Sequence, residues 1–430
     1  MAHIEPFQAF RYDPSQVTLA DVVTQPYDKV SPAMQERYYS ASPYNLVRII
    51  LGKRNATDGA DDNPYTRAAG SFRDWRRDGI FRQDTKASLY RYAQTFSRPG
   101  SETQLERKGF IALGRLEDYS ANVVFRHEQT LAKPKADRLD LLRATRAHFG
   151  QIFMLYSDPA GEIETSLATA DSPTSEVTDE YGVVHRLWQI SDPKVIESAR
   201  AAMLDKKLII ADGHHRYETA LTYRNERRSQ AGKAAGPHDF VMMTFVNLEN
   251  PGLVILPTHR VVHSLSGFSM DSFRAGACDY FSVEEADANV NARRATAMLR
   301  EAGHTGTSFL VAGRDKVFLL SRPKAPASAF GDLSFRQQGL DVVQLHKCLL
   351  ENVLGISEQA VRDQKNVTYI RETSDALDMV RSGQADAAFI MNPARMQQVR
   401  DIAFSNEVLP QKSTDFYPKL LSGLTVYALE

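Results

Sequence analysis

The chain has 430 residues, of which 43% are hydrophobic and 24% are charged, a composition typical of globular proteins with two or three domains. Its 52 lysines and arginines nearly balance its 53 aspartates and glutamates, so no overall charge favours nucleic acid or an acidic membrane. The two cysteines fit no CxxC spacing, and no apolar run approaches the roughly 18 residues of a membrane helix, so we expect a reduced cytoplasmic protein.

The first predicted domain, residues 1–105, combines turn-rich and amphipathic pieces. The stretch QPYDKVSP is a proline-bounded loop, and a helix that carries Phe72 and Trp75 on one face follows it. A meander of strand-like runs begins at the end of this domain with ASLYRYAQTF and continues into the second domain with KGFIALGRL and NVVF. This domain is expected to be an α/β segment that leads into the central part of the chain.

The second predicted domain, residues 106–265, alternates strands and helices. After the meander we expect a loop RHEQT, a helix ADRLDLLRATRAHFG and a buried strand QIFMLY. Residues 158–182 have no clear period and predict a loop or a short surface excursion. A helix capped by Asp192, with Pro193 in its first turn, then leads into the strand LIIA. Two further runs, DFVMMTFVNL and GLVILPTHRVV, predict strands of the same sheet.

The third predicted domain, residues 266–430, contains shorter elements. SFLVAG and KVFLLS predict a hairpin, and VTYIRETSDALDMVRSGQADAAFIM gives strand, helix and strand in a βαβ-like order. The expected fold class is therefore α/β (α+β), with a mixed sheet at its centre and additional α/β segments at both ends.

The junction KKLIIADGHHRYETAL is the most informative stretch of the sequence. A strand ends in Asp212-Gly213-His214-His215-Arg216, where a helix pattern begins. The first N–H groups of a helix lack intrahelical partners and carry partial positive charge, so anions bind there. A glycine allows a tight turn, and an arginine can hold a phosphate with two hydrogen bonds. These five residues predict a phosphate cradle.

Two other interpretations of the same junction stay open. The aspartate can simply cap the helix, with the glycine in the turn and both histidines as surface or packing residues. Histidine and aspartate also ligate zinc or iron, although adjacent histidines point apart on a helix and no HxxxH or CxxC partner stands beside them. The identity of any metal is left open.

LIIADGHHRYETAL resembles the signature of the ParB/sulfiredoxin-like fold, and its DGHHR form resembles that of archaeal free-serine kinases. The motifs PYD, HEQT, KADR, ILPTHR and YPKLLSGL resemble the family known as domain of unknown function 1015, over nearly the whole chain. The first resemblance implies a nucleotide-binding core in which Asp212, Gly213, His214, His215 and Arg216 contact ATP or ADP, with Mg²⁺ nearby. Histidines occupy the place of the reactive cysteine of sulfiredoxins, and we find no helix-turn-helix of the ParB kind.

Phosphoryl transfer also needs a group that accepts the proton of the attacking hydroxyl. Glu128 is the predicted base, and the predicted catalytic set is completed by His127 and His215. A solvated loop glutamate is the alternative for Glu128. Basic or polar residues near predicted strand and helix ends are expected to bind substrate: Lys135, Arg138, Thr258, His259 and Arg260. Lys419 is expected to serve only in docking the chain terminus.

The leading hypothesis is an ATP- or ADP-dependent kinase of a small hydroxylated metabolite, with free L-serine as the first candidate. The second is a ParB-like nucleotide switch that acts through a partner or DNA, and the third is a metal-dependent hydrolase that uses the histidines. Neither a membrane nor a nucleic acid is an expected partner under the leading hypothesis. The oligomeric state is left open.

Overall fold

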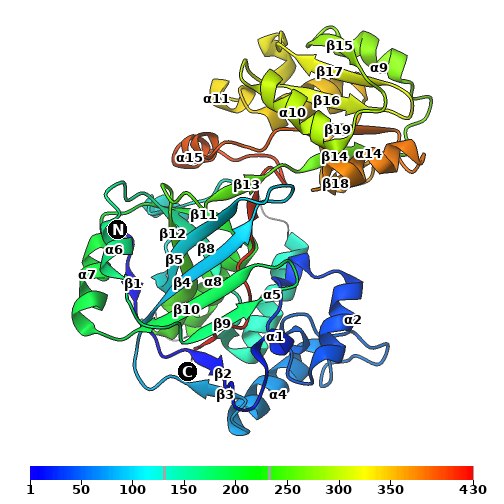
Figure 1. Cartoon of the computed structure of the whole chain (residues 1–430). Coiled ribbons are helices and arrows are strands. Elements are labelled where there is room, and N and C mark those ends of the chain that lie inside the picture. Colours follow the sequence, from blue (N-terminus) through cyan, green and yellow to red (C-terminus); the bar gives the residue numbers. More distant parts are fainter. Residues whose placement is uncertain (129–131, 231–233, 430) are drawn as a thin grey trace. The chain divides into compact units, whose positions relative to one another are not determined.

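The chain forms two compact units in the computed structural model, which describes residues 1–128, 132–230 and 234–429. Unit 1 contains Met1–Arg126, Thr130–Val254 and Pro418–Glu430, and unit 2 contains His127–Gln129 and Ile255–Tyr417. The C-terminal segment, red in Figure 1, therefore returns to unit 1. The predicted three-part division at residues 105 and 265 stays a prediction, and residue 105 lies inside a strand of unit 1.

Unit 1 is built on a sheet of nine strands among the residues described, in the order β6-β11-β8-β12-β5-β4-β10-β9, with β1 paired to β5. The bounds are β1 Ile4–Glu5, β4 Leu89–Ser97, β5 Gln104–Arg115, β6 Val124–Phe125, β8 Ile152–Tyr156, β9 Ser175–Thr178, β10 Val184–Ile190, β11 Leu208–Asp212 and β12 Phe240–Asn247. Strand β11 runs parallel to β6 and antiparallel to β8, and β12 runs parallel to β8, so the sheet is mixed. The expected α/β class with a mixed sheet is confirmed, whereas the ParB/sulfiredoxin-like core stays a prediction.

The strand sequences explain the position of the core in unit 1. Strand β8 is buried along its whole length, as is the apolar part of β11. Continuous apolar runs are typical of strands that are covered on both faces. The core cluster also takes Met203 and Tyr217 from two helices that pack on the sheet.

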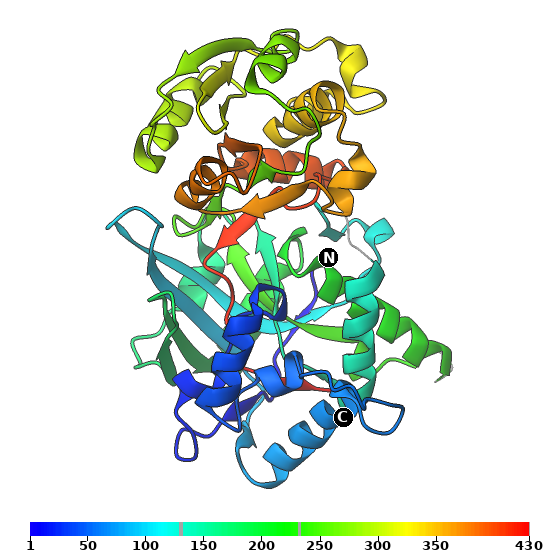
Figure 2. The ribbon, with the colours of Figure 1, turned by 90° about the vertical axis from the view of Figure 1, so that its right-hand side faces the viewer.

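Helices of unit 1 are α1 Leu19–Val22, α2 Pro32–Ala41, α3 Val47–Ile50, α4 Pro64–Arg77, α5 Ala132–Thr145, α6 Glu162–Ser166, α7 Pro193–Met203 and α8 His214–Gln230, with single turns η1 Tyr27–Lys29, η2 Tyr119–Ala121 and η3 Pro237–Asp239. Helix α5 lies alongside α8 and also contacts α4 (Figures 1 and 2). Asp192 caps α7 by accepting the N–H of Lys194, as predicted. The predicted face of α4 is likewise confirmed, because Phe72 and Trp75 are both buried.

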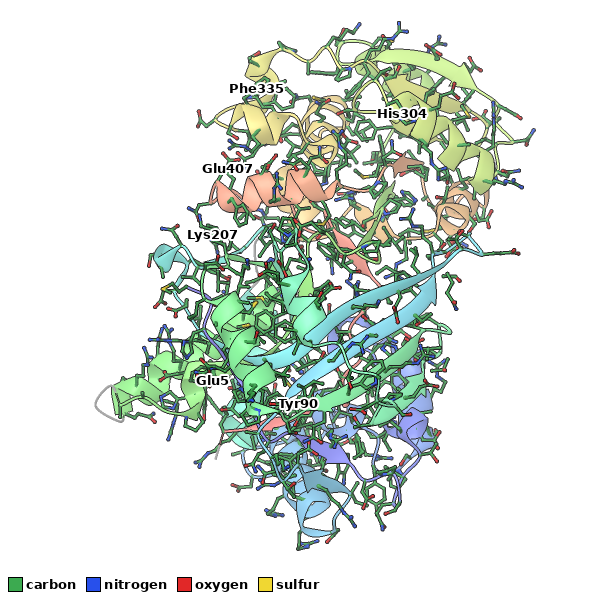
Figure 3. All side chains as sticks on the ribbon, turned by 60° about the vertical axis from the view of Figure 1, so that its left-hand side comes forward. Glu5, Tyr90, Lys207, His304, Phe335 and Glu407 are labelled. Atoms are coloured by element: carbon green, nitrogen blue, oxygen red, sulfur yellow. The ribbon has the colours of Figure 1, made fainter. Side chains whose placement is uncertain are left out.

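The two ends of the chain join unit 1 through short pairings. Strand β2 (Phe10–Tyr12) pairs with β3 (Phe81–Gln83), and β21 (Tyr427–Ala428) pairs with β7 (Ala147–His148). Tyr90, labelled in Figure 3, is fully buried, and its hydroxyl accepts the N–H of Ala9 at 3.0 Å. The N-terminal segment is therefore fixed to the sheet.

Unit 2 has a six-stranded sheet in the order β15-β17-β16-β19-β14-β18, in which neighbouring strands are antiparallel. The strands of unit 2, with two short ones that stand apart from this sheet, are β13 Val254–Leu256, β14 His259–Val262, β15 Ser282–Ala286, β16 Phe309–Ala312, β17 Val317–Ser321, β18 Val367–Ile370, β19 Ala387–Met391 and β20 Asp415–Tyr417. The predicted β16–β17 hairpin is confirmed.

Helices of unit 2 are α9 Met270–Ala277, α10 Ala292–Gly303, α11 Phe335–Gln338, α12 Asp341–Gln344, α13 Glu358–Arg362, α14 Thr373–Arg381 and α15 Met396–Phe404, with a single turn η4 Ala327–Phe330 and a π-helix η5 Leu345–Val353. Helices α10 and α14 share one apolar cluster with the sheet. None of the described helices in either unit is long and apolar enough to span a membrane.

Three local expectations need correction. The predicted strand 252–262 divides into β13 and β14, and β14 joins the sheet of unit 2 instead of that of β12. The predicted helix 136–150 ends at Thr145, because Arg146 has a left-handed backbone (φ 47°) and the chain then enters β7. The stretch 158–182 contains a helix, α6, and a sheet strand, β9, so it is more regular than a surface loop.

Candidate functional site: the strand–helix turn of unit 1

The turn between β11 and α8 has the geometry that the sequence predicts. Strand β11 ends at Asp212, Gly213 has φ of +94°, and α8 begins at His214. A positive φ is readily adopted by glycine, and a Cβ atom at this position would lie 3.1 Å from the guanidinium of Arg216. Glycine therefore provides both the turn and the space for the arginine.

Asp212 is surrounded by cationic side chains. Its Oδ2 accepts a hydrogen bond from Nη2 of Arg216 at 2.7 Å, and Nζ of Lys419 lies 3.5 Å from its Oδ1. Burial alone would raise the pKa of Asp212, but the charges of Lys419, Arg216, Lys29 and His214 outweigh burial and hold the pKa well below its usual range. The carboxylate is therefore ionised throughout the physiological pH range.

The guanidinium of Arg216 is held from two sides. Nη1 donates to the carbonyl of Gln151, and Nη2 donates to Asp212. Gly150 lies against the same group, since a Cβ atom there would be 3.2 Å from Nη1. A guanidinium has five N–H donors, and these two contacts use only part of them. The arginine is thus oriented in advance and can donate to an anion as well.

Lys419 is placed beside the turn by residues from the centre of the sheet. Its carbonyl accepts from Nε2 of Gln94 at 2.8 Å, and the carbonyl of Pro418 accepts from Arg107. Arg107 is 1% exposed, donates to Oε1 of Gln94 and stacks on the ring of Phe153, and burial lowers its pKa to about 10. A buried polar network therefore fixes the main chain at Lys419, which agrees with the expected docking of the terminus, and the contact of its side chain with Asp212 comes in addition.

A small cavity of about 70 Å³ lies beside the turn and has room for a few water molecules. Arg216 and Arg138 both line it, with Tyr27, Gly150 and Ser422. Arg138 stacks on the ring of Tyr27 with its guanidinium carbon 4.2 Å from the ring centroid. The structure thus brings together two of the predicted binding residues from different helices.

The predicted substrate residue Lys135 has a partner on α8. Its Nζ donates to Oε2 of Glu218 at 2.9 Å, and Nη1 of Arg126 lies 3.6 Å from the other carboxylate oxygen. Glu218 is one helical turn after His214, on the same face of α8. The sequence analysis did not select Glu218, since a single glutamate in a helix gives no distinguishing signal.

The predicted base Glu128 and its neighbour His127 belong to unit 2. His127 is fully buried, and its Nε2 lies 2.9 Å from Oγ1 of Thr414. Oε1 of Glu128 accepts the main-chain N–H of Lys412 at 2.8 Å. Gln129 and Thr130 of the HEQT motif lie outside the described residues. The approach of Glu128 to the turn of unit 1 stays a prediction.

Thr258, His259 and Arg260 also belong to unit 2, and two of them are buried there. Nε2 of His259 lies 2.9 Å from Oγ1 of Thr373, and burial lowers the His259 pKa to about 4. Arg260 is 1% exposed and donates to the carbonyl of Thr258. His259 and Arg260 are thus held by hydrogen bonds within unit 2. The role of Thr258, His259 and Arg260 in substrate binding stays a prediction.

No group of three or more histidine, cysteine, aspartate or glutamate side chains that could hold a metal ion occurs within residues 1–128, 132–230 and 234–429. Cys278 and Cys348 are both free of disulfide bonds.

The fold and the turn define an α/β protein with a cationic strand–helix junction, and comparison with known proteins identifies its family. A family described as "Protein of unknown function (DUF1015)" matches residues 4–343, and the chain belongs to this family. The predicted family is thus confirmed over residues 4–343, which contain the motifs PYD, HEQT, KADR and ILPTHR, whereas YPKLLSGL lies beyond the match. No curated protein matches the chain.

Solved structures with detectable similarity share little sequence with the chain. A conserved hypothetical protein from Pyrococcus furiosus is 13% identical, with a TM-score of 0.36, over 71% of this chain and 92% of that one. A free serine kinase in complex with AMP is 12% identical, with a TM-score of 0.36, over 72% and 88%. A C-terminally truncated SbnI from Staphylococcus aureus is 10% identical, with a TM-score of 0.34, over 74% and 87%.

Proposed function

We propose that the protein is an ATP- or ADP-dependent kinase that phosphorylates a hydroxyl group of a small metabolite, with free L-serine as the first candidate acceptor. The proposal extends the resemblance of the DGHHR motif to free-serine kinases. The observation that carries it is the convergence of cationic side chains from distant segments on one helix N-terminus.

Lys29, Arg216 and Lys419 come from three separate parts of the chain, and the charges of all three act on Asp212. If the turn served only to cap helix α8, Asp212 alone would be enough, because one carboxylate can accept the first N–H groups of the helix. The additional cations supply the positive charge that nucleotide phosphates require. This surplus favours the phosphate cradle over the capping interpretation.

The residues at the turn have separate roles in this proposal. Arg216 and the main-chain N–H groups at the start of α8 hold phosphate oxygens, and Lys419 neutralises their charge. Mg²⁺, which supplies charge neutralisation on phosphates when bound, takes one or two carboxylates together with phosphate oxygens. Asp212 fits that requirement, because its neighbours keep it ionised.

Glu128 serves as the base in this proposal and accepts the proton of the acceptor hydroxyl. Its Oε1 accepts the main-chain N–H of Lys412 at 2.8 Å, and this hydrogen bond orients the carboxylate. A carboxylate with one oxygen held by the main chain has a fixed direction of approach, as a general base requires.

Binding of a nucleotide through its phosphates should stabilise the folded protein. A ligand at 100 times its dissociation constant adds about 2.7 kcal/mol to the stability of the state that binds it. We expect ATP or ADP to raise the thermal unfolding midpoint of the full chain, and adenosine to raise it much less, because adenosine lacks phosphates. Differential scanning fluorimetry measures both. An equal shift with adenosine, or no shift with any nucleotide, would contradict a phosphate site.

A further inference from the structure

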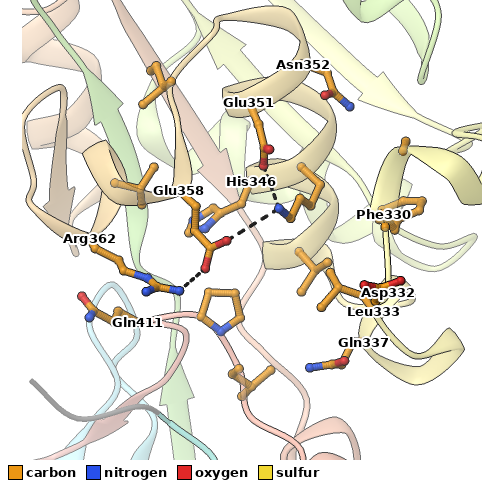
Figure 4. A pocket seen from close by; sticks show the side chains of 18 of the residues that line it. Phe330, Asp332, Leu333, Gln337, His346, Glu351, Asn352, Glu358, Arg362 and Gln411 are labelled. Atoms are coloured by element: carbon orange, nitrogen blue, oxygen red, sulfur yellow. Dashed lines mark hydrogen bonds and ion pairs between the residues drawn. The ribbon is translucent and has the colours of Figure 1, made fainter.

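Unit 2 contains a cavity of about 900 Å³, which lies in the size range of about 300–1,000 Å³ that is usual for small-molecule sites. Figure 4 shows it from close by. The charged helices η5 and α13 that line it follow residue 343, where the match to the family ends. The lining residues from Tyr280 to Val343 fall inside the family match, and the rest of the lining follows it.

Both walls of the cavity carry apolar as well as polar side chains. One wall comes from η4, α11 and the segment between them, and the other comes from η5 and α13. The apolar side chains that line it are Pro326, Phe330, Leu333, Val343, Ile356, Val361, Val408, Leu409 and Pro410. Such a lining accepts the hydrocarbon part of a ligand.

The cations of the cavity are already paired with its carboxylates. Nζ of Lys347 lies 2.8 Å from Oε2 of Glu351 and 3.7 Å from Oε2 of Glu358, and Arg362 forms an ion pair with the other oxygen of Glu358 (Figure 4). A ligand that brought only negative charge would have to compete with these carboxylates for both cations. The two cations are thus neutralised by their neighbours, whereas an ionised carboxylate has about four acceptor sites and can accept further N–H donors.

A third carboxylate, Asp332, lies on the other wall, beside Phe330 and away from Glu351 and Glu358 (Figure 4). Asp332 has neither an ion pair nor a hydrogen bond with the side chains that the structure describes. His346 adds no positive charge, because its Nε2 accepts from Nε of Arg260 at 3.4 Å and burial lowers its pKa well below the usual value. Three carboxylates and two cations leave one negative charge in excess.

The hydroxyl of Tyr369, another residue that lines the cavity, is buried and has no hydrogen-bond partner within the described part of the chain. Buried hydroxyl groups without a partner are uncommon in folded proteins. The phenol oxygen can accept a hydrogen bond from an N–H donor. The oxygen is covered by protein atoms, so a ligand in the cavity can use it only after the side chains over it move.

We propose that the cavity binds an aliphatic diamine or polyamine. One ammonium group pairs with Asp332, another pairs with Glu351 or Glu358, and the methylene chain between them packs on the apolar surface. Carboxylates on two walls that also carry apolar side chains match the alternation of charge and methylene groups in such a molecule. The site is distinct in ligand chemistry from the phosphate cradle, and the proposal does not depend on kinase activity.

The position of the ligand can be tested through the segment beside Glu128. Leu409, Pro410 and Gln411 line the cavity, and the next residue, Lys412, donates its N–H to Glu128. A ligand that packs on this segment should slow amide hydrogen exchange at Leu409, Gln411 and Lys412, since Pro410 has no N–H. Hydrogen exchange measured with and without spermidine therefore reports occupancy at this cavity, whereas binding elsewhere on the surface would leave these amides unchanged.

Isothermal titration calorimetry of the full chain with spermidine and putrescine tests the proposal. We expect saturable binding, with no binding of 1,4-butanediol, which has the same methylene chain without charge. Asp332→Asn and Glu351→Gln should each weaken spermidine binding about tenfold, the size expected for one charge-assisted hydrogen bond. Glu301→Gln, an exposed carboxylate on α10 away from the cavity lining, should leave the affinity unchanged.

Asp332 and Glu351 are on the wall of an open cavity, so their amide variants should fold, and an unchanged unfolding midpoint checks this. Equal loss of affinity in Glu301→Gln would show that spermidine responds only to overall charge and would overturn the proposal. Absence of saturable binding, or full affinity in both cavity variants, would overturn it as well. Either result would leave the proposed kinase function standing, because its test uses nucleotides.

Discussion

Replacing Glu128 with glutamine should cut turnover by about 100-fold or more and leave nucleotide affinity unchanged. A general base contributes about 10²- to 10⁴-fold to rate, and an amide cannot accept the hydroxyl proton. Glutamine retains an oxygen that can accept the N–H of Lys412, so the local hydrogen bond persists. Steady-state kinetics give turnover, and calorimetry with ADP gives the affinity.

The control for this variant is Glu301→Gln, which removes an exposed carboxylate of the same unit and should change neither quantity. Wild-type turnover in Glu128→Gln would exclude Glu128 as the base. A parallel loss of nucleotide affinity would instead assign Glu128 to ground-state binding, because a base that acts only on the hydroxyl affects the chemical step.

Replacing Arg216 with alanine should weaken nucleotide binding by about tenfold or more, because charge-assisted hydrogen bonds to phosphate are about twice as strong as neutral ones. Arg216→Lys should restore affinity only in part, since lysine keeps the charge but lacks the planar fork. Lys419→Met should weaken binding in the same direction through loss of one positive charge. The dissociation constants for ATP and ADP measure all three effects.

The matched control is Arg227→Ala, near the other end of α8, where the arginine is partly exposed and donates to Gln230. At a rise of about 1.5 Å per residue it lies roughly 16 Å along the helix from Arg216, too far to contact the same phosphate. Arg216 also holds Asp212 and the carbonyl of Gln151, so the unfolding midpoint of each variant is needed beside its affinity. Full nucleotide affinity in a folded Arg216→Ala variant would contradict the cradle.

Features set by neighbouring residues could be predicted from the sequence. The strand LIIA, the glycine turn and helix α8 follow from an apolar run, a residue that tolerates positive φ and a helical pattern in direct succession. The cap at Asp192 could be predicted because aspartate is a common N-cap and Pro193 after it favours the first turn of a helix. In each case the determining contacts lie within a few residues.

Features set by pairing between distant segments could not be predicted. Lys419 reaches Asp212 because Gln94 and Arg107, more than 300 residues earlier, bind the main chain at Pro418 and Lys419. Strand β14 belongs to the sheet of unit 2 because it pairs with β18 and β19, which lie more than 100 residues later in the chain. Strand propensity identifies an extended segment but does not specify its partners.

The most direct test of the proposed function is an assay for phosphoryl transfer with the purified full chain. The protein is incubated with Mg²⁺, ATP or ADP, and a panel led by L-serine, other hydroxy amino acids and small polyols, and phosphorylated products are identified by mass spectrometry. We expect O-phosphoserine, or the phosphate ester of another acceptor in the panel, to form with an increase in nucleotide consumption. Tight nucleotide binding that alters affinity for DNA or a protein partner, with no acceptor phosphorylated, would contradict the kinase assignment and favour a nucleotide switch.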